Sequence, residues 1–384
     1  QAWIGGEALH VFLRAIIPGW QTLLGGPIGG HMTTEWISFL LFWGMNIFII
    51  YRGMDLLRHV ENWAAPFVLI MTALLLGWAI WKANGLGYLL TQQSKFQTVG
   101  QFWKIFIPSL TAMIGFWATL SLNMPDFTRF GRSQKQQAVG QVLALPTTMT
   151  VFAAMGVMIT SAAVVIYPHM KPEELWDPMK LVGQFQNVAV IAISMFTVVV
   201  ATLAVNIAAN VVSPANDFAN AFPRWISFRT GGLITGVAGI LMQPWRLLAD
   251  PSGYIFTWLG GYSGGLASIA GVLITDYWLV RNKQLALGDL YRTRGEYRYA
   301  GGWNWRAVVA TLIGCVLAWC GPIVARILAL AGVAQSPRIA LLLWFLNLLY
   351  DYAWFVGFGA SAAAYFLLMM LSPPRGQSSE AIAS

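Results

Sequence analysis

The stretch NVAVIAISMFTVVVATLAVNIAANVVSPANDFANAFP, residues 187–223, decides the fold class of this chain. From Val188 it opens with about 18 almost purely apolar residues, which is long enough for one helix to cross a bilayer. Asn206 and Asn210 follow without a break in the apolar pattern, and this spacing places both amides on one face of a helix. A carboxamide in hydrocarbon is costly unless it is paired. The two asparagines therefore either bond to a neighbouring helix or form a hydrogen-bonding face for a small polar ligand.

The composition is that of a polytopic membrane protein. Hydrophobic residues make up 57% of the 384 residues and charged residues only 10%, whereas a soluble domain has about 25% charged residues. Lys and Arg on cytoplasmic loops then explain the net charge of +8, and no binding to nucleic acid is expected. Cys315 and Cys320 lie in one apolar segment and the four histidines are scattered, so the sequence predicts no disulfide framework and no metal site.

The apolar segments predict an all-α integral membrane protein in which residues 1–384 form a single polytopic domain. Ten spans are expected, at about 1–16, 36–52, 64–82, 102–123, 138–167, 188–212, 231–249, 254–280, 305–329 and 350–371. The apolar segment 340–350 is either a short interfacial helix or the start of the last span. Residues 373–384 are expected to form a short cytoplasmic tail. Because the chain opens inside an apolar run without a start methionine, we expect a fragment.

The basic residues predict the orientation in the membrane. More of the 23 Lys and Arg residues lie on the loops at about 52–62, 124–137, 222–230 and 281–304 than on the alternate loops. The positive-inside rule places these four loops in the cytoplasm, so the first visible helix runs from inside to outside. The sequence therefore predicts a multi-pass protein of the cytoplasmic membrane.

A glycine and two aromatic residues lie near the middle of the predicted span 102–123. Gly115 weakens a helix there, and interrupted helices at the midplane expose backbone groups to ligands in transporters. Trp117, which follows Phe116, offers a flat face for stacking and an indole N–H donor. These three residues are candidate ligand-binding residues. The alternative is a kinked, packed helix whose tryptophan faces lipid or the core, since the chain has 19 tryptophans.

Charged residues at the ends of spans, and one inside a span, suggest different roles. Asp126 and Arg129 are three apart and are expected to pair at the cytoplasmic surface as a gate or anchor. Asp276, Tyr277 and Arg281, at the end of the span 254–280, are expected to form a second surface anchor of this kind. Glu7 instead lies within an apolar run, where a carboxyl is expected to be neutral or to exchange a proton. The alternative is a structural glutamate that faces a neighbouring helix.

Motifs typical of enzymes are missing from the sequence. It has no nucleotide-binding loop, no HExxH motif, no nucleophile elbow and no clustered pair of acids. We therefore predict that the chain is not an enzyme and needs no cofactor. The segment GGYSGGLASIAG, residues 260–271, allows either close helix contact or a dimerisation face, so the oligomeric state stays open.

Six motifs extend over nearly the whole chain. They are QAWIGGEAL at 1–9, ENWAAP at 61–66, IGFWATLSLNMPDFTRF at 114–130, NIAANVVSPANDFANAFP at 206–223, ITDYWLVR at 274–281 and GGWNWRA at 301–307. Each is weak alone, but in this order and on these spans they resemble the nucleobase–cation symporter-1 family. The members of that family include bacterial hydantoin, allantoin, uracil and cytosine permeases. The residues of these motifs are most similar to those of the allantoin, hydantoin and uracil branch.

The resemblance implies a fold of twelve spans, shared with the sodium–leucine transporters. Two five-helix repeats of opposite topology hold the substrate at the midplane in that fold. The ten visible spans would then be the third to the twelfth. The first two spans, which supply part of the cation and substrate sites, would be missing.

The resemblance also implies which residues contact the substrate. The family's glutamine on the third helix matches Gln1, and a stacking tryptophan would lie four residues before it. The small residue and the tryptophan at the broken sixth helix match Phe116 and Trp117. Phe116 departs from the glycine of hydantoin permease, which weakens the match to that substrate. The amide on the eighth helix matches Asn210, with Asn206 one turn before it.

The family's sodium site is not matched. Its pattern has a small residue, then Ser and Thr, just before the first asparagine of the eighth helix. These positions are Ala201, Ala204 and Val205 here. Ala201 can still offer a backbone carbonyl, but the two hydroxyl oxygens are gone and hard cations need several oxygen ligands. We therefore hypothesise coupling to H⁺, or a weakened requirement for Na⁺, with Glu7 as the proton carrier.

The function that the resemblance implies is symport across the cytoplasmic membrane. The substrate would be a small planar ring such as allantoin, uracil or hydantoin, and its partner a coupling cation. Trp117 would stack on the ring while Asn210 and Gln1 pair with its cyclic amide. Three alternatives stay open: a transporter of the same fold for an amino acid or vitamin, a membrane-bound enzyme, and a membrane sensor that binds without transporting.

Overall fold

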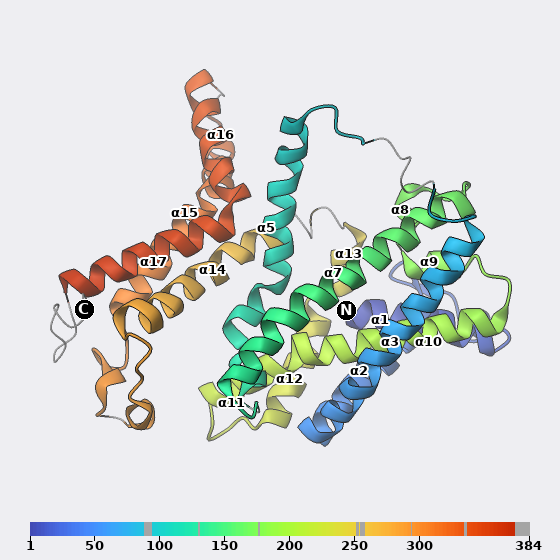
Figure 1. Ribbon diagram of the computed structural model, residues 1–384, viewed down its shortest axis with the longest axis horizontal. Coiled ribbons are helices and arrows are strands. Elements are labelled where there is room, and N and C mark those ends of the chain that lie inside the picture. The colour runs from blue at the N-terminus through green and yellow to red at the C-terminus, as the bar shows by residue number, and fades with distance from the viewer. Residues whose placement is uncertain are drawn as a thin grey trace. The chain divides into compact units, whose positions relative to one another are not determined.

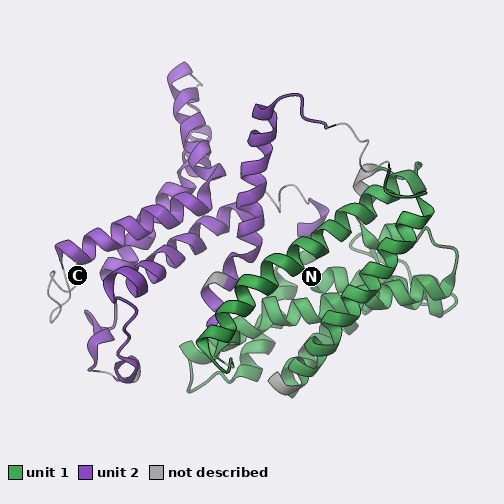
Figure 2. Cartoon of the chain, viewed as in Figure 1, with its two compact units in different colours: residues 1–94, 126–246 green, residues 95–125, 247–384 purple. Residues whose placement is uncertain are grey.

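The computed structural model describes residues 1–87, 94–129, 131–175, 177–250, 253, 258–292, 294–333 and 336–372. They belong to two compact units (Figure 2): unit 1 contains residues 1–94 and 126–246, and unit 2 contains residues 95–125 and 247–384. The predicted tail 373–384 lies outside the described residues. The single polytopic domain of residues 1–384 stays a prediction.

Unit 1 is mainly helical (Figure 1), and its described residues include a short hairpin. Its elements are α1 (Ala2–Ile16), η1 (Trp20–Thr22), β1 (Pro27–Ile28), β2 (His31–Met32), α2 (Thr33–Arg52), α3 (Met54–Lys82), α6 (Pro125–Thr128), α7 (Gln134–Ile166), α8 (Pro172–Leu175), α9 (Pro178–Val182), α10 (Val188–Asn206), η2 (Ile207–Val212), α11 (Ser213–Ala221), α12 (Phe228–Leu241) and α13 (Pro244–Ala249), which ends in unit 2. β1 pairs antiparallel with β2. Helix α1 packs on α2 and α10, and the buried core between them includes Phe42, Met195 and Ile207.

Unit 2 contains the other long helices. Its elements are α5 (Val99–Asn123), α14 (Gly260–Thr275), η4 (Asp276–Val280), η5 (Leu287–Tyr291), η6 (Glu296–Arg298), α15 (Trp305–Leu330), α16 (Pro337–Asp351) and α17 (Ala353–Leu371). Helix α14 packs against α5, α15 and α17. Its small residues bring the neighbouring backbones close together.

Side chains fix the starts of several long helices. Asn187 Oδ1 accepts a hydrogen bond from the Ala189 N–H at 2.9 Å, which satisfies a free donor in the first turn of α10. Thr98 and Ser133 cap α5 and α7 in the same way. Polar residues just before apolar runs therefore set where these helices begin.

Two glycines show how closely the helices approach. A Cβ on Gly6 of α1 would lie 2.6 Å from the Phe39 Cα, so only glycine allows α1 to cross α2 at this distance. A Cβ on Gly271 of α14 would lie 2.5 Å from the carbonyl oxygen of Phe358 in α17. The close helix contact predicted for residues 260–271 is confirmed within the chain.

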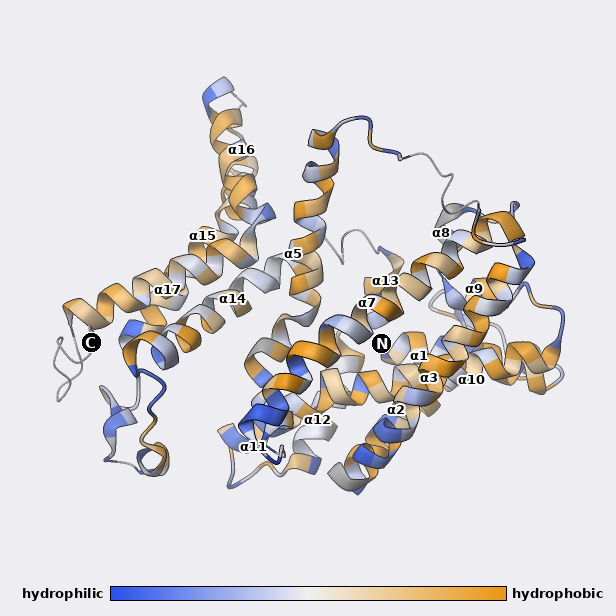
Figure 3. Cartoon of the chain, viewed as in Figure 1, coloured by the Kyte–Doolittle hydropathy of each residue, from blue (hydrophilic) through white to orange (hydrophobic). Residues whose placement is uncertain are grey.

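Eight helices of the described residues are long and apolar enough to cross a membrane. They are Thr33–Arg52, Leu56–Lys82, Val99–Leu120, Gln134–Ile166, Val188–Ala221, Gly260–Val280, Trp305–Leu330 and Ala353–Leu371, and Figure 3 shows their mostly hydrophobic colouring. The predicted span 1–16 is the shorter helix α1. A multi-pass helical membrane protein is confirmed, but the predicted number of ten spans is not. Residues 254–257 of the eighth predicted span lie outside the described residues.

Two segments differ from the predicted spans. The segment 231–249 is not one helix, because α12 ends at Leu241 and α13 begins at Pro244. Proline disfavours helical backbone in the residue before it, and Gln243 has a φ of 52°. The segment 340–350 belongs to a separate helix, α16, which ends at Asp351, so it is not the start of the last span.

Candidate functional site

Three carboxamides predicted as ligand-binding residues meet in unit 1. Asn210 Nδ2 donates to Gln1 Oε1 at 2.6 Å and to Asn206 Oδ1 at 3.0 Å. The first bond joins residues 209 apart in sequence, because α1 packs on α10. Asn206 is only 8% exposed, whereas Asn210 is exposed within its unit. The amides therefore form a chain that leads from the interior of the unit to an accessible end.

A fourth carboxamide, Asn46 of α2, extends this chain and was not predicted from the sequence. Asn206 Nδ2 donates to Asn46 Oδ1 at 3.0 Å, and Asn46 Nδ2 donates to the Phe42 carbonyl at 2.7 Å. Asn46 is 3% exposed. The sequence signal was one carboxamide inside the apolar run FLLFWGMNIFII, residues 39–50, the same kind of signal as Asn206.

The backbone of the candidate site is a π-helical turn. The segment Ile207–Val212, which contains Asn210, follows α10 directly after Asn206 and precedes Ser213 of α11. Such turns widen the helix and occur often at functional sites. The two amides nevertheless stay within hydrogen-bond distance, so the spacing of four predicts their shared face correctly.

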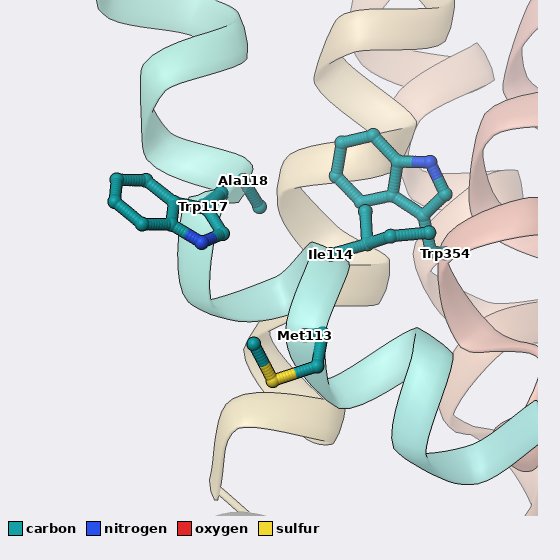
Figure 4. A pocket seen from close by; sticks show the side chains of 5 residues that line it. All are labelled: Met113, Ile114, Trp117, Ala118 and Trp354. Atoms are coloured by element: carbon teal, nitrogen blue, oxygen red, sulfur yellow. The ribbon is translucent and has the colours of Figure 1, made fainter. Parts of the chain in front are cut away.

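Trp117 lies in unit 2 beside a small apolar cavity of about 330 Å³. Met113, Ile114, Ala118 and Trp354 also line this cavity (Figure 4). The Phe116 and Trp117 rings meet edge to face, with their centroids 5.2 Å apart. Trp117 thus has an apolar space beside it.

The interruption expected at Gly115 is not present, because α5 continues as one helix from Val99 to Asn123. A Cβ on Gly115 would lie 2.8 Å from the Leu259 carbonyl oxygen and 2.9 Å from the Ser263 Cβ. Tyr262 Oη donates to the Gly115 carbonyl at 2.8 Å. Gly115 therefore allows close packing of α5 on α14, and a tyrosine bonds to its carbonyl.

The positions of the family's sodium ligands lie on α10. The side chains of Ala201, Ala204 and Val205 are hydrocarbon and provide no oxygen. The Ala204 carbonyl accepts the N–H of Ile207, where the π turn begins. The residues present thus fit a cation poorly. Any ligand at these positions would have to be a backbone carbonyl, as noted for Ala201.

Glu7 has a partner on its own helix. Trp3 Nε1 donates to Glu7 Oε1 at 2.7 Å. The Trp3 ring is 2% exposed and packs among four aromatic rings, those of His31, Trp36, Phe39 and Trp245. This contact favours a structural role for Glu7, and its role as proton carrier stays a prediction.

The two predicted anchors differ in what the structure gives them. Arg129 Nη2 donates to Asn216 Oδ1 of α11 at 3.4 Å, which ties the segment after α6 to α11. The pairing of Asp126 with Arg129 stays a prediction. Asp276 accepts from Arg281 Nε at 2.7 Å, so these two residues are in contact, and their role as an anchor stays a prediction.

Arg281 is the centre of a buried cluster that holds the loop after η4. Its guanidinium also donates to Glu296 Oε1 at 2.7 Å and to Tyr299 Oη at 2.6 Å. Tyr365 of α17 donates to the second oxygen of Asp276 at 2.7 Å. The Arg281 side chain is only 4% exposed. The cluster therefore joins the end of η4, the following loop and α17.

Ionisation in this cluster follows from burial and charge. Burial alone would lower the pKa of Arg281, but the Asp276 carboxylate beside it raises that pKa above its usual value. Burial also raises the pKa of the Tyr299 hydroxyl. A charged arginine and a neutral tyrosine are therefore the stable forms at neutral pH.

These features define a multi-pass helical membrane protein with a chain of carboxamides between its helices. Residues 1–357 match the model of the permease family for cytosine/purines, uracil, thiamine and allantoin, and the chain belongs to this family. Because that family consists of permeases, the prediction that the chain is not an enzyme agrees with it. This match does not support the predicted loss of two spans.

Two relatives are similar over almost the whole chain. The purine-uracil permease NCS1 of Arabidopsis thaliana is 38% identical over 371 residues, which are 96% of this chain and 59% of that protein. The allantoin permease of Bacillus subtilis (strain 168) is 35% identical over 384 residues, covering 100% of this chain and 73% of that protein. The chain thus spans between about three-fifths and three-quarters of the length of these two relatives.

The fold is similar to a solved transporter. The structure of Mhp1, described as a nucleobase-cation-symport-1 family transporter in a closed conformation with bromovinylhydantoin bound, matches with a TM-score of 0.67. The identity is 21%, and the match covers 100% of this chain and 75% of that one. This likeness supports the all-α transporter fold and says nothing about the ligand of this chain.

Proposed function

We propose that this protein takes up a small planar nucleobase-like or hydantoin-like ring together with a cation across the cytoplasmic membrane. The observation that carries the proposal is the bond between Asn210 of η2 and Gln1, the residue before α1, which places two carboxamides side by side. Adjacent carboxamides suit a ring that has N–H and C=O groups on neighbouring atoms. The names of the relatives, which include purine, uracil and allantoin permeases, agree with this substrate class.

The residues proposed to bind the substrate are those that the family resemblance implies. Trp117 stacks on the ring, next to Phe116 and Gly115, while Asn210 and Gln1 bond to its amide edge. Asn206 holds Asn210 in place. The family match covers all the segments that carry these residues.

The direct test is counterflow in proteoliposomes with a panel of labelled ligands. We expect exchange with at least one of uracil, allantoin and hydantoin, and weaker exchange with thiamine and with amino acids. Preference for thiamine or an amino acid would favour a transporter of the same fold with another substrate. Binding without counterflow would favour a sensor.

We also propose that the coupling ion is H⁺. Replacing Na⁺ by choline in the external buffer is expected to leave the initial uptake rate largely unchanged, because Ala204 and Val205 provide no hydroxyl ligands for Na⁺. A protonophore is expected to reduce uptake strongly. Loss of uptake in choline would contradict proton coupling without affecting the proposed substrate class.

A further inference from the structure

The four linked carboxamides have a direction that their chemistry fixes. A backbone carbonyl can only accept hydrogen bonds, so Asn46 must direct its NH₂ group toward Phe42. Its oxygen then faces Asn206, which must donate to it. The oxygen of Asn206 consequently faces Asn210, which donates in turn. One backbone carbonyl in α2 therefore determines the orientation of three asparagine amides.

This direction determines what the accessible end of the chain offers to a ligand. Asn210 Nδ2 uses both of its hydrogens, one for Asn206 Oδ1 and one for Gln1 Oε1. Within the described part of unit 1, no protein partner is found for Asn210 Oδ1 or for Gln1 Nε2. One acceptor and one donor thus remain side by side. A ligand that presents N–H to Asn210 and C=O to Gln1 satisfies both.

We propose that Asn46 is a positioning residue, which sets the donor and acceptor preference of the substrate site through Asn206. This inference rests on the proposed function, because it assumes that the ligand bonds to Asn210 and Gln1. Asn46 and Asn206 are 3% and 8% exposed, so water does not readily replace either partner. Without Asn46, the Asn206 NH₂ group has no fixed acceptor, and the Asn206 amide can rotate so that its oxygen and its NH₂ group exchange positions. The Asn210 amide can then rotate in the same way and present N–H to the ligand in place of its oxygen.

Uracil and cytosine are matched probes for this preference. The two rings have nearly the same shape, but uracil presents N–H and C=O where cytosine presents a ring nitrogen acceptor and an NH₂ donor. The amide direction in this protein favours uracil. Asn46→Leu keeps the branched shape of the side chain with a larger volume, and it removes both of its hydrogen bonds. We expect it to reduce the cytosine-over-uracil ratio of dissociation constants about tenfold.

Three further variants separate positioning from general damage. Asn46→Asp retains an acceptor for Asn206 and is expected to keep the uracil preference. Ser38→Ala removes a buried hydrogen bond from the same helix, that of Ser38 Oγ to the Thr34 carbonyl, and is expected to leave the ratio unchanged. Asn46→Ala removes the same two hydrogen bonds with a smaller side chain, and it replaces Asn46→Leu in the test if the larger leucine prevents folding.

Each outcome bears on one of the two proposals. A wild-type protein that does not prefer uracil, or an Asn46→Leu variant that weakens both ligands equally, overturns the role of Asn46. Loss of ligand binding in Asn210→Ala with an unchanged ratio in Asn46→Leu would reject the positioning role and leave the proposed function standing. Normal binding in Asn210→Ala would reject the proposed function itself.

Discussion

Asn210→Ala is expected to abolish uptake while folded protein remains in the membrane. The substitution removes the acceptor for the ligand and leaves the oxygens of Gln1 and Asn206 without their donor. The ligand N–H enclosed by the site loses its acceptor, which costs about 1–3 kcal/mol, so ligand affinity should fall by about 5-fold to 150-fold. Equilibrium binding to purified protein, together with uptake by proteoliposomes, measures this loss.

Asn187→Ala is the matched control on the same helix. Asn187 Oδ1 caps the start of α10, at the opposite end from Asn210. Its removal should cost about 1 kcal/mol of stability, as for other N-caps, and leave ligand affinity unchanged. Wild-type uptake by the Asn210→Ala variant would show that the proposed site is wrong, whatever the effect of Asn187→Ala.

The sequence predicts the amide site in part, because some of its geometry is local. Residues four apart on a helix share a face, so the pairing of Asn206 with Asn210 follows from spacing alone. Gln1 is suggested only by its match to a family motif. Asn46 lies 160 residues from Asn206, and their bond depends on how α2 packs near α10. Spacing in the sequence contains no information on that contact.

The helices are predicted better than their interruptions. Long apolar runs give the positions of most spans, because a helix of that length matches the thickness of the hydrocarbon core of the bilayer. The break expected at Gly115 is not there, because Leu259 and Tyr262 of unit 2 pack against its backbone. The break at Pro244 was missed although proline is a known local signal. Apolar composition alone had favoured one span there.

Arg281→Met is expected to destabilise unit 2 strongly. The Arg281 side chain is 4% exposed and donates to Asp276, Glu296 and Tyr299. Removing one partner of a buried ion pair leaves the other charge uncompensated, which costs about 3–5 kcal/mol for full burial. Because Asp276 and Glu296 are 24% and 38% exposed, we expect about 2–3 kcal/mol. Thermal unfolding of purified protein in nanodiscs measures the effect.

Arg292→Met tests whether burial causes this loss. Arg292 pairs with Asp289 at 3.4 Å in the same loop, but its side chain is 74% exposed. Exposed ion pairs contribute about 0–1 kcal/mol, because water and salt screen both charges. Arg292→Met should therefore unfold at nearly the wild-type temperature, and Arg281→Met well below it. Equal unfolding temperatures for the two variants would mean that the Arg281 cluster does not hold the loop against η4 and α17.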